Sequence, residues 1–149
     1  MITALQTPLA WSRRAIAALD ALQPLAQLLA RLFVAQAFFL SGLTKLRDWD
    51  STLSLFTDEY HVPLLSPNVA ALMGTGGELL LPVLLVLGLA GRFAAAGLSV
   101  VNVVAVLSLA EIAPAALHQH QLWGSLLAGL LLWGPGRWSA DAWFMRRLA

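Results

Sequence analysis

Long runs of apolar residues, separated by short polar stretches, follow one another along most of this chain. A helix that crosses the hydrocarbon core of a bilayer needs about 20 mainly apolar residues. Runs of roughly this length predict four membrane-spanning helices, over Pro24–Leu46, Asn68–Ala90, Arg92–Ile112 and Gln119–Gly134. The only long connection, Arg47–Pro67, is expected to contain a short surface helix. Short connections favour antiparallel neighbours, so the predicted fold is an all-α, four-helix transmembrane bundle.

The two ends of the chain are more polar than its middle. Residues 1–23 predict an N-terminal interfacial segment with Trp11 as its anchor, or alternatively a disordered leader. Residues 24–135 form the predicted transmembrane domain. Residues 136–149 form a C-terminal cytoplasmic segment, in which Ala140–Leu148 predicts a short surface helix.

Composition also indicates a membrane protein. Of the 149 residues, 59% are hydrophobic and only 11% are charged, whereas soluble domains have about 25% charged residues. The mean hydropathy is +0.76. The lipid bilayer is therefore an expected partner, and nucleic acid is not, because the net charge is only +1 and no basic run occurs. The chain has no cysteine, which excludes disulfide exchange, thiolate catalysis and cysteine-ligated iron–sulfur chemistry from this chain acting alone.

Lysine and arginine residues are distributed unevenly around the predicted helices. Six arginines fall on one side of the membrane, and Lys45 and Arg47 fall on the other. Positive residues mark the cytoplasmic side, so both termini should face the cytoplasm of a bacterium whose inner membrane the chain crosses several times. The long acidic loop should then face the periplasm. The six arginines are Arg13, Arg14, Arg92, Arg137, Arg146 and Arg147.

One acidic and one basic residue lie deep inside the predicted helices. A charge at the bilayer centre costs at least about 2.5–3.5 kcal/mol on insertion scales. At about 1.5 Å per residue, Arg31 should reach toward Glu78, which predicts a buried pair or a site at which Glu78 carries a proton. Alternatively, Arg31 extends to the interface and Glu78 is protonated. Gln36 and Asn102 lie near the same depth, and either complete a polar layer or hydrogen-bond a facing helix.

Further polar residues occur at the predicted outer face. Lys45 is expected to contact an anion or headgroup, to extend to the interface, or to pair with Glu111. Histidines 61, 118 and 120 are of the type that binds metals, but His118 and His120 would lie on opposite sides of a helix. We therefore interpret them as polar loop residues and predict no metal site.

Several of these residues occur together in one pattern. Arg31 is followed by Ser41–Leu46, then by Glu78 with Leu87–Arg92, and finally by Gly134–Asp141. In this order and spacing, the pattern resembles the DoxX family of small four-helix membrane proteins, from about Arg31 to Asp141. Gly134–Asp141 also predicts a structural turn in which Arg137 and Asp141 pair. The resemblance implies that the characteristic polar positions are Arg31, Lys45, Glu78, Arg92, Arg137 and Asp141.

The resemblance also implies a set of functions. The name-giving relatives are membrane subunits of a thiosulfate:quinone oxidoreductase, and others are linked to membrane-bound oxidative-stress complexes. The first hypothesis is therefore a membrane subunit of such a complex, with a redox partner subunit and with quinone as the candidate cofactor, none being held within the chain itself. The alternatives are a non-catalytic membrane anchor or assembly factor, and a small proton-coupled transporter formed by a homo-oligomer. Catalysis by the chain alone is left open.

Overall fold

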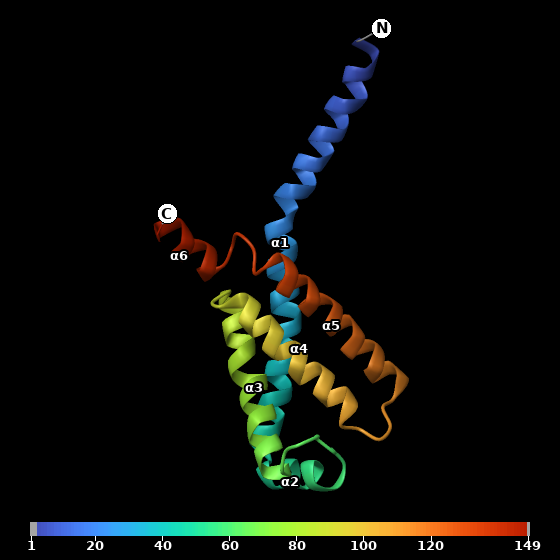
Figure 1. Cartoon of the computed structure of the whole chain (residues 1–149), viewed down its shortest axis with the longest axis vertical. Coiled ribbons are helices and arrows are strands. Elements are labelled where there is room, and N and C mark those ends of the chain that lie inside the picture. Colours follow the sequence, from blue (N-terminus) through green and yellow to red (C-terminus); the bar gives the residue numbers. More distant parts are fainter. Residues whose placement is uncertain (1–2, 149) are drawn as a thin grey trace.

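A computed structural model describes residues 3–148 of the chain, with side chains from residue 11 onward. This part contains six α-helices joined by short connections (Figure 1). No strand occurs in this part, which confirms the all-α prediction. Residues 1, 2 and 149 of the predicted terminal segments lie outside it. The helices are α1 (Thr3–Arg47), α2 (Trp49–Asp58), α3 (Pro67–Leu87), α4 (Gly91–Leu107), α5 (Pro114–Trp133) and α6 (Ala140–Leu148).

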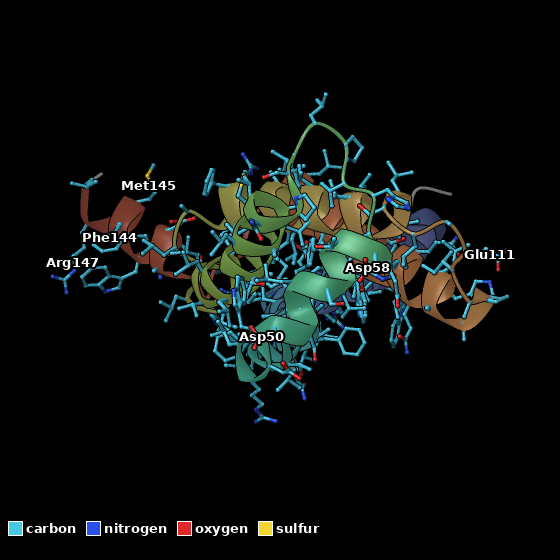
Figure 2. The ribbon with its side chains drawn as sticks, turned by 90° about the horizontal axis from the view of Figure 1, so that it is seen from below. Asp50, Asp58, Glu111, Phe144, Met145 and Arg147 are labelled. Carbon is cyan, nitrogen blue, oxygen red and sulfur yellow. The ribbon has the colours of Figure 1, made fainter. Side chains whose placement is uncertain are left out.

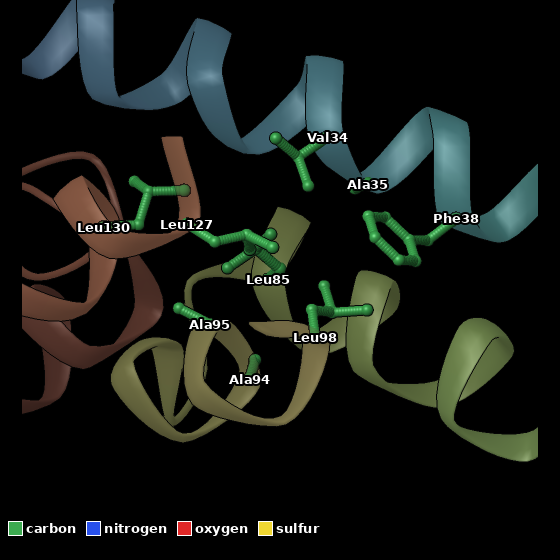
Figure 3. Packing of buried hydrophobic residues seen from close by; sticks show 9 residues of the cluster. All are labelled: Val34, Ala35, Phe38, Leu85, Ala94, Ala95, Leu98, Leu127 and Leu130. Atoms are coloured by element: carbon green, nitrogen blue, oxygen red, sulfur yellow. The ribbon is translucent and has the colours of Figure 1, made fainter. Parts of the chain in front are cut away.

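Four of these helices share one hydrophobic core. Side chains from α1, α3, α4 and α5 meet where the helices cross (Figure 3). Ala94 and Ala95 of α4 are fully buried, and their small side chains let α4 approach its neighbours closely. The buried members of this core are Val34, Ala35, Phe38, Leu85, Ala94, Ala95, Leu98, Leu127 and Leu130.

The helix α1 is longer than predicted. Its 45 residues run without a break through Pro24, where the sequence predicted a helix start. At about 1.5 Å per residue it is roughly 65–70 Å long, and its N-terminal part extends beyond the other helices (Figure 1). The predicted start was wrong because alanine and leucine, which favour helices strongly, surround Pro24 on both sides. The interfacial placement of residues 1–23 stays a prediction.

A short helix forms in the long connection, as the sequence predicted, and it packs against α3. Asp48 begins α2, because its carboxylate accepts hydrogen bonds from the Ser51 backbone N–H (3.0 Å) and hydroxyl (2.6 Å). These hydrogen bonds lower the pKa of Asp48. Phe56 of α2 is buried against Ala70 and Ala71 of α3 in a second, smaller core. We call the end of the molecule that carries α2 the α2 end, and the opposite end of α3–α5 the α6 end (Figure 1).

The boundaries of α4 and α5 differ from the predicted ones. The helix α4 ends at Leu107 rather than Ile112, where the Ser108 hydroxyl donates to the Val104 carbonyl at 2.6 Å. The helix α5 begins at Pro114, a favoured residue for the first helical turn. His118 and His120 therefore lie in a helix, and the prediction that they are loop residues was wrong.

Within the described residues, two helices are long and apolar enough to cross a membrane: the segment Trp11–Arg47 of α1, and α3. The helix α4 is apolar but shorter. Length and composition therefore support two crossings directly, and a bundle of four crossings stays a prediction.

Candidate functional site

An ion pair joins α1 to α3 at the α2 end. The Lys45 ammonium lies in the last turn of α1, and its Nζ is 2.6 Å from Oε2 and 2.8 Å from Oε1 of Glu78, which is buried within α3. Lys45 also donates to the Ser41 hydroxyl at 2.9 Å, and that hydroxyl donates to Glu78 Oε1 at 3.3 Å. Ser41 and Lys45 are four residues apart, so they lie on the same face of α1. Both Glu78 oxygens are thus held by side chains of α1.

Gly42 allows α1 and α3 to come this close. A Cβ atom added at Gly42 would lie 2.9 Å from Leu79 Cγ and 3.1 Å from Glu78 Cβ. Real Cβ atoms essentially never approach other atoms more closely than 3.0 Å, so Leu79 would have to shift. Ser41, Gly42 and Lys45 therefore act together on Glu78. Ser41 and Lys45 donate hydrogen bonds to its carboxylate, and Gly42 lets α1 lie close enough to α3 for these bonds to form.

The structure does not bring Arg31 or Glu111 to these partners, so the predicted Arg31–Glu78 and Lys45–Glu111 pairs were wrong. Arg31 lies at the level of Val86, eight positions beyond Glu78, or about 12 Å further along α3. The Arg31 side chain is too short to cover that distance. Lys45 lies beside Glu78 instead, because α1 and α3 pack antiparallel. Glu111 is exposed in the α4–α5 connection.

Arg31 instead joins three parts of the chain at the α6 end. Its guanidinium is buried and donates to the Val86 carbonyl at 3.2 Å and to the Trp138 carbonyl. A Cβ at Gly88, whose φ is +64°, would collide with Arg31 and Ser139. A cation here also faces the negative end of the α3 helix dipole. Arg31 therefore fixes the end of α3 to the segment that follows α5.

Asp141 completes this connection by capping α4 rather than its own helix. Its two carboxylate oxygens accept hydrogen bonds from the backbone N–H groups of Ala90 and Gly91, each at 2.8 Å. Ser139 caps α6, because its hydroxyl accepts from the Ala142 N–H at 3.2 Å. Both carboxylate oxygens of Asp141 serve α4, so the predicted Arg137–Asp141 pair was wrong.

The other two residues predicted near Glu78 lie elsewhere, so the expected polar layer does not form. Asn102 of α4 donates through Nδ2 to the His120 carbonyl at 3.0 Å, and its Oδ1 is 2.8 Å from His120 Nδ1. Gln36 is exposed and lines an apolar groove between α1 and α3 that includes Pro82. Asn102 thus binds α4 to α5, while Gln36 faces outward.

Arg92 and Arg137 lie at the α6 end. Arg92 donates to the Leu132 carbonyl at 3.2 Å, and Arg137 is exposed. The histidines come from separate places, and the side chains described here include no cluster of three His, Asp or Glu residues that could hold a metal ion.

A cavity of about 200 Å³ lies beside the Lys45–Glu78 pair, between α2, α3, α4 and the loop after α2. Most of its lining is apolar, and Tyr60 and Ser108 provide hydroxyl groups. Burial raises the pKa of Tyr60, and the charges of Glu59 and Glu78 raise it further. Tyr60 was not predicted from the sequence, although it is the only tyrosine and lies two residues beyond the end of α2. The remaining lining residues are Phe56, Val62, Leu65, Ala70, Met73, Gly74, Val100, Val101, Val104 and Ala105.

Comparison with known protein families decides the identity of the chain. The family model of DoxX matches residues 26–111, more than half of the chain. The chain belongs to the DoxX family. The match includes the Lys45–Glu78 pair and the α3–α4 turn, and it ends before the segment Gly134–Asp141. Together with the two long apolar helices, it makes this DoxX protein a membrane protein. No curated protein and no solved structure matches the chain.

Proposed function

We propose that this DoxX protein is the membrane subunit of a quinone-linked oxidoreductase or oxidative-stress complex, and that the cavity beside Lys45 and Glu78 binds the quinone ring. The observation that carries the proposal is a buried ion pair in the wall of an otherwise apolar cavity. Ligand sites are mostly apolar with a few polar groups placed to orient the ligand, which describes this lining. Intramembrane ionisable residues also tend to mark substrate or proton pathways.

The residues fit such a ring chemically. A quinone presents an apolar ring with carbonyl oxygens that accept hydrogen bonds, and the Tyr60 hydroxyl in the lining is a donor, while the three N–H groups of Lys45 are directed at Glu78 and Ser41. The volume of about 200 Å³ is below the roughly 300–1,000 Å³ of drug-sized sites, so it suits a ring but not a long tail. A bound quinone would supply two-electron, two-proton redox chemistry, with electrons from a partner subunit. Tyr60 would orient the ring, the positive charge of Lys45 would lie beside it, and Glu78 would hold or release a proton.

The same proposal includes four membrane crossings in a bacterial inner membrane, with both termini in the cytoplasm. The distribution of charge supports this orientation. The α6 end carries Arg92 and Arg137, together with the arginines of α6. Acidic residues gather at the α2 end, where Figure 2 shows Asp50, Asp58 and Glu111. The Lys45–Glu78 site then lies in the periplasmic half of the bundle.

The quinone content of purified protein tests the proposal. Protein extracted from membranes in mild detergent is analysed for bound quinone per chain. Glu78→Gln and Lys45→Met should reduce the quinone content strongly, and Glu111→Gln, which removes an exposed acid outside the cavity, should leave it unchanged. Quinone that is absent from the unmodified protein, or retained equally by all variants, would refute the proposal.

A non-catalytic anchor is the second candidate, because Lys45 and Ser41 together occupy both oxygens of Glu78. In this case the pair only holds α1 against α3, and a partner complex supplies all the chemistry. Glu78→Gln should then reduce the amount of assembled complex in the membrane while each assembled complex keeps full activity. Under the quinone proposal, the activity per assembled complex falls instead.

A further inference from the structure

A second hollow lies at the α6 end, far from the Lys45–Glu78 pair. It is a groove of about 570 Å³ between α1, the start of α4, the segment after α5 and α6. Gln23 and Gln27 of α1 line one side, and Arg92 and Arg137 contribute two guanidinium groups. The family match covers its α1 and α4 residues from Gln27 to Phe93, and the proposed function assigns this groove no ligand.

The groove is positively charged and has hydrogen-bond donors to spare. Arg92 uses one N–H for the Leu132 carbonyl at 3.2 Å, and a guanidinium has five N–H donors. Arg137 is exposed, with no hydrogen-bond partner in the described part of the chain. Asp141 also lines the groove, but its carboxylate is held by the Ala90 and Gly91 N–H groups. Arg92 and Arg137 together carry two positive charges and Asp141 carries one negative charge, so the groove has a net positive charge.

Two glycines fix the wall of this groove. Gly134 and Gly136 have φ angles of +86° and +89°, a conformation that side-chain-bearing residues rarely adopt. A Cβ at Gly136 would collide with the Gln27 side chain, and a Cβ at Gly134 would lie 3.5 Å from Arg92 Nε. The segment after α5 therefore packs directly against Gln27 and Arg92. This packing gives the groove a fixed shape.

The rim of the groove is apolar. Phe93, Trp133 and Met145 line it and are 66%, 77% and 68% exposed. The neighbouring helix α6 ends in Arg146 and Arg147 and exposes Trp143 and other large apolar side chains, a combination typical of a helix that lies at a membrane surface. Two guanidinium groups beside exposed apolar side chains match a phosphate joined to acyl chains better than they match a free, fully hydrated anion.

We propose that this groove binds the phosphate of an anionic phospholipid, held by Arg92 and Arg137 with the acyl chains against the apolar rim. Arginine suits this role because its planar fork donates two parallel hydrogen bonds to phosphate oxygens. Basic pockets between membrane helices on the cytoplasmic side are a recognised kind of headgroup site. Free phosphate shares the headgroup chemistry but would gain nothing from the rim.

Native mass spectrometry of the full chain in detergent tests the site with phosphatidylglycerol, phosphatidylcholine and inorganic phosphate as probes. We expect one phosphatidylglycerol per chain to be retained in preference to phosphatidylcholine. Arg137→Gln should weaken this retention about fivefold, the factor for about 1 kcal/mol per arginine. Arg147→Gln is the matched control, because Arg147 stacks on the Trp143 ring of α6 and does not line the groove.

The outcomes separate the alternatives. Equal retention of the two lipids, or equal losses with Arg137→Gln and Arg147→Gln, would overturn the site. Displacement of phosphatidylglycerol by millimolar inorganic phosphate would assign the groove to free phosphate and overturn the lipid as its ligand. Arg92→Gln should weaken binding as well, and if that variant fails to fold through loss of its bond to the Leu132 carbonyl, Arg137→Gln alone decides.

Discussion

Removing one partner of the Lys45–Glu78 pair should destabilise the protein far more than removing both. The two side chains are 17% and 9% exposed, so the pair belongs with buried ion pairs and not with surface pairs, which contribute about 0–1 kcal/mol. Lys45→Met leaves Glu78 with only the 3.3 Å hydrogen bond from Ser41. Stranding a buried charge in this way costs about 3–5 kcal/mol.

The double variant Lys45→Met/Glu78→Gln should recover most of this loss. It leaves no unpaired charge, and the glutamine still accepts the Ser41 hydrogen bond. Because the double variant loses less than either single variant, the coupling free energy between the two positions should be at least about 3 kcal/mol, the top of the range for residues in contact. Equilibrium unfolding in mixed detergent–SDS micelles, followed by tryptophan fluorescence, measures the free energy of unfolding of each variant.

The control cycle pairs Lys45→Met with Glu111→Gln, whose side chain is exposed in another part of the chain. These two losses should add to within about 0.3–0.5 kcal/mol. If the Lys45/Glu78 double variant loses the sum of its single losses, the two residues are not coupled, and the reasoning from their geometry fails.

Three further predictions follow from the two ends of the molecule. Asp141→Ala should lower the free energy of unfolding by about 0.5–2 kcal/mol, because the start of α4 loses its cap. Gly88→Ala should lower it by about 1–2 kcal/mol for the backbone at φ +64° alone, and by more for the collision with Arg31. Tyr60 should titrate above its ordinary pKa of about 10 in ultraviolet difference spectra, and Glu78→Gln should lower that pKa.

The controls for these predictions come from the same regions. Gly76→Ala meets nothing within 4 Å and should not destabilise α3, so an equal loss at Gly76 and Gly88 would contradict the steric argument. Because folding raises the pKa of Tyr60, its contribution to stability is complete below about pH 10 and is lost as the pH rises through the folded value. An unchanged Tyr60 titration in Glu78→Gln would show that the carboxylate exerts no field there.

The helices could be predicted from the sequence more easily than the hydrogen-bond and ion-pair partners of their polar side chains. Apolar runs located the helices, and Ala140–Leu148 was predicted with the bounds of α6. The partner of Glu78 could not be predicted from the number of residues to the end of each helix. That number gives the depth of a residue in the membrane, but not the side of the helix on which it lies or the helix that it faces. Asp141 was expected to serve a nearby partner, yet its hydrogen bonds run to residues 50 and 51 positions earlier. Only the packed structure brings such distant positions together.

The link from Arg31 to Trp138 has a consequence for how the protein is made. The two residues are 107 positions apart, so the guanidinium enters the membrane long before its second acceptor has been synthesised. At about 5–20 residues per second, the wait lasts about 5–20 s. During that time Arg31 must reach water or lipid headgroups by extending along α1. The order of synthesis thus makes the joining of α1 to the segment between α5 and α6 a late event in folding.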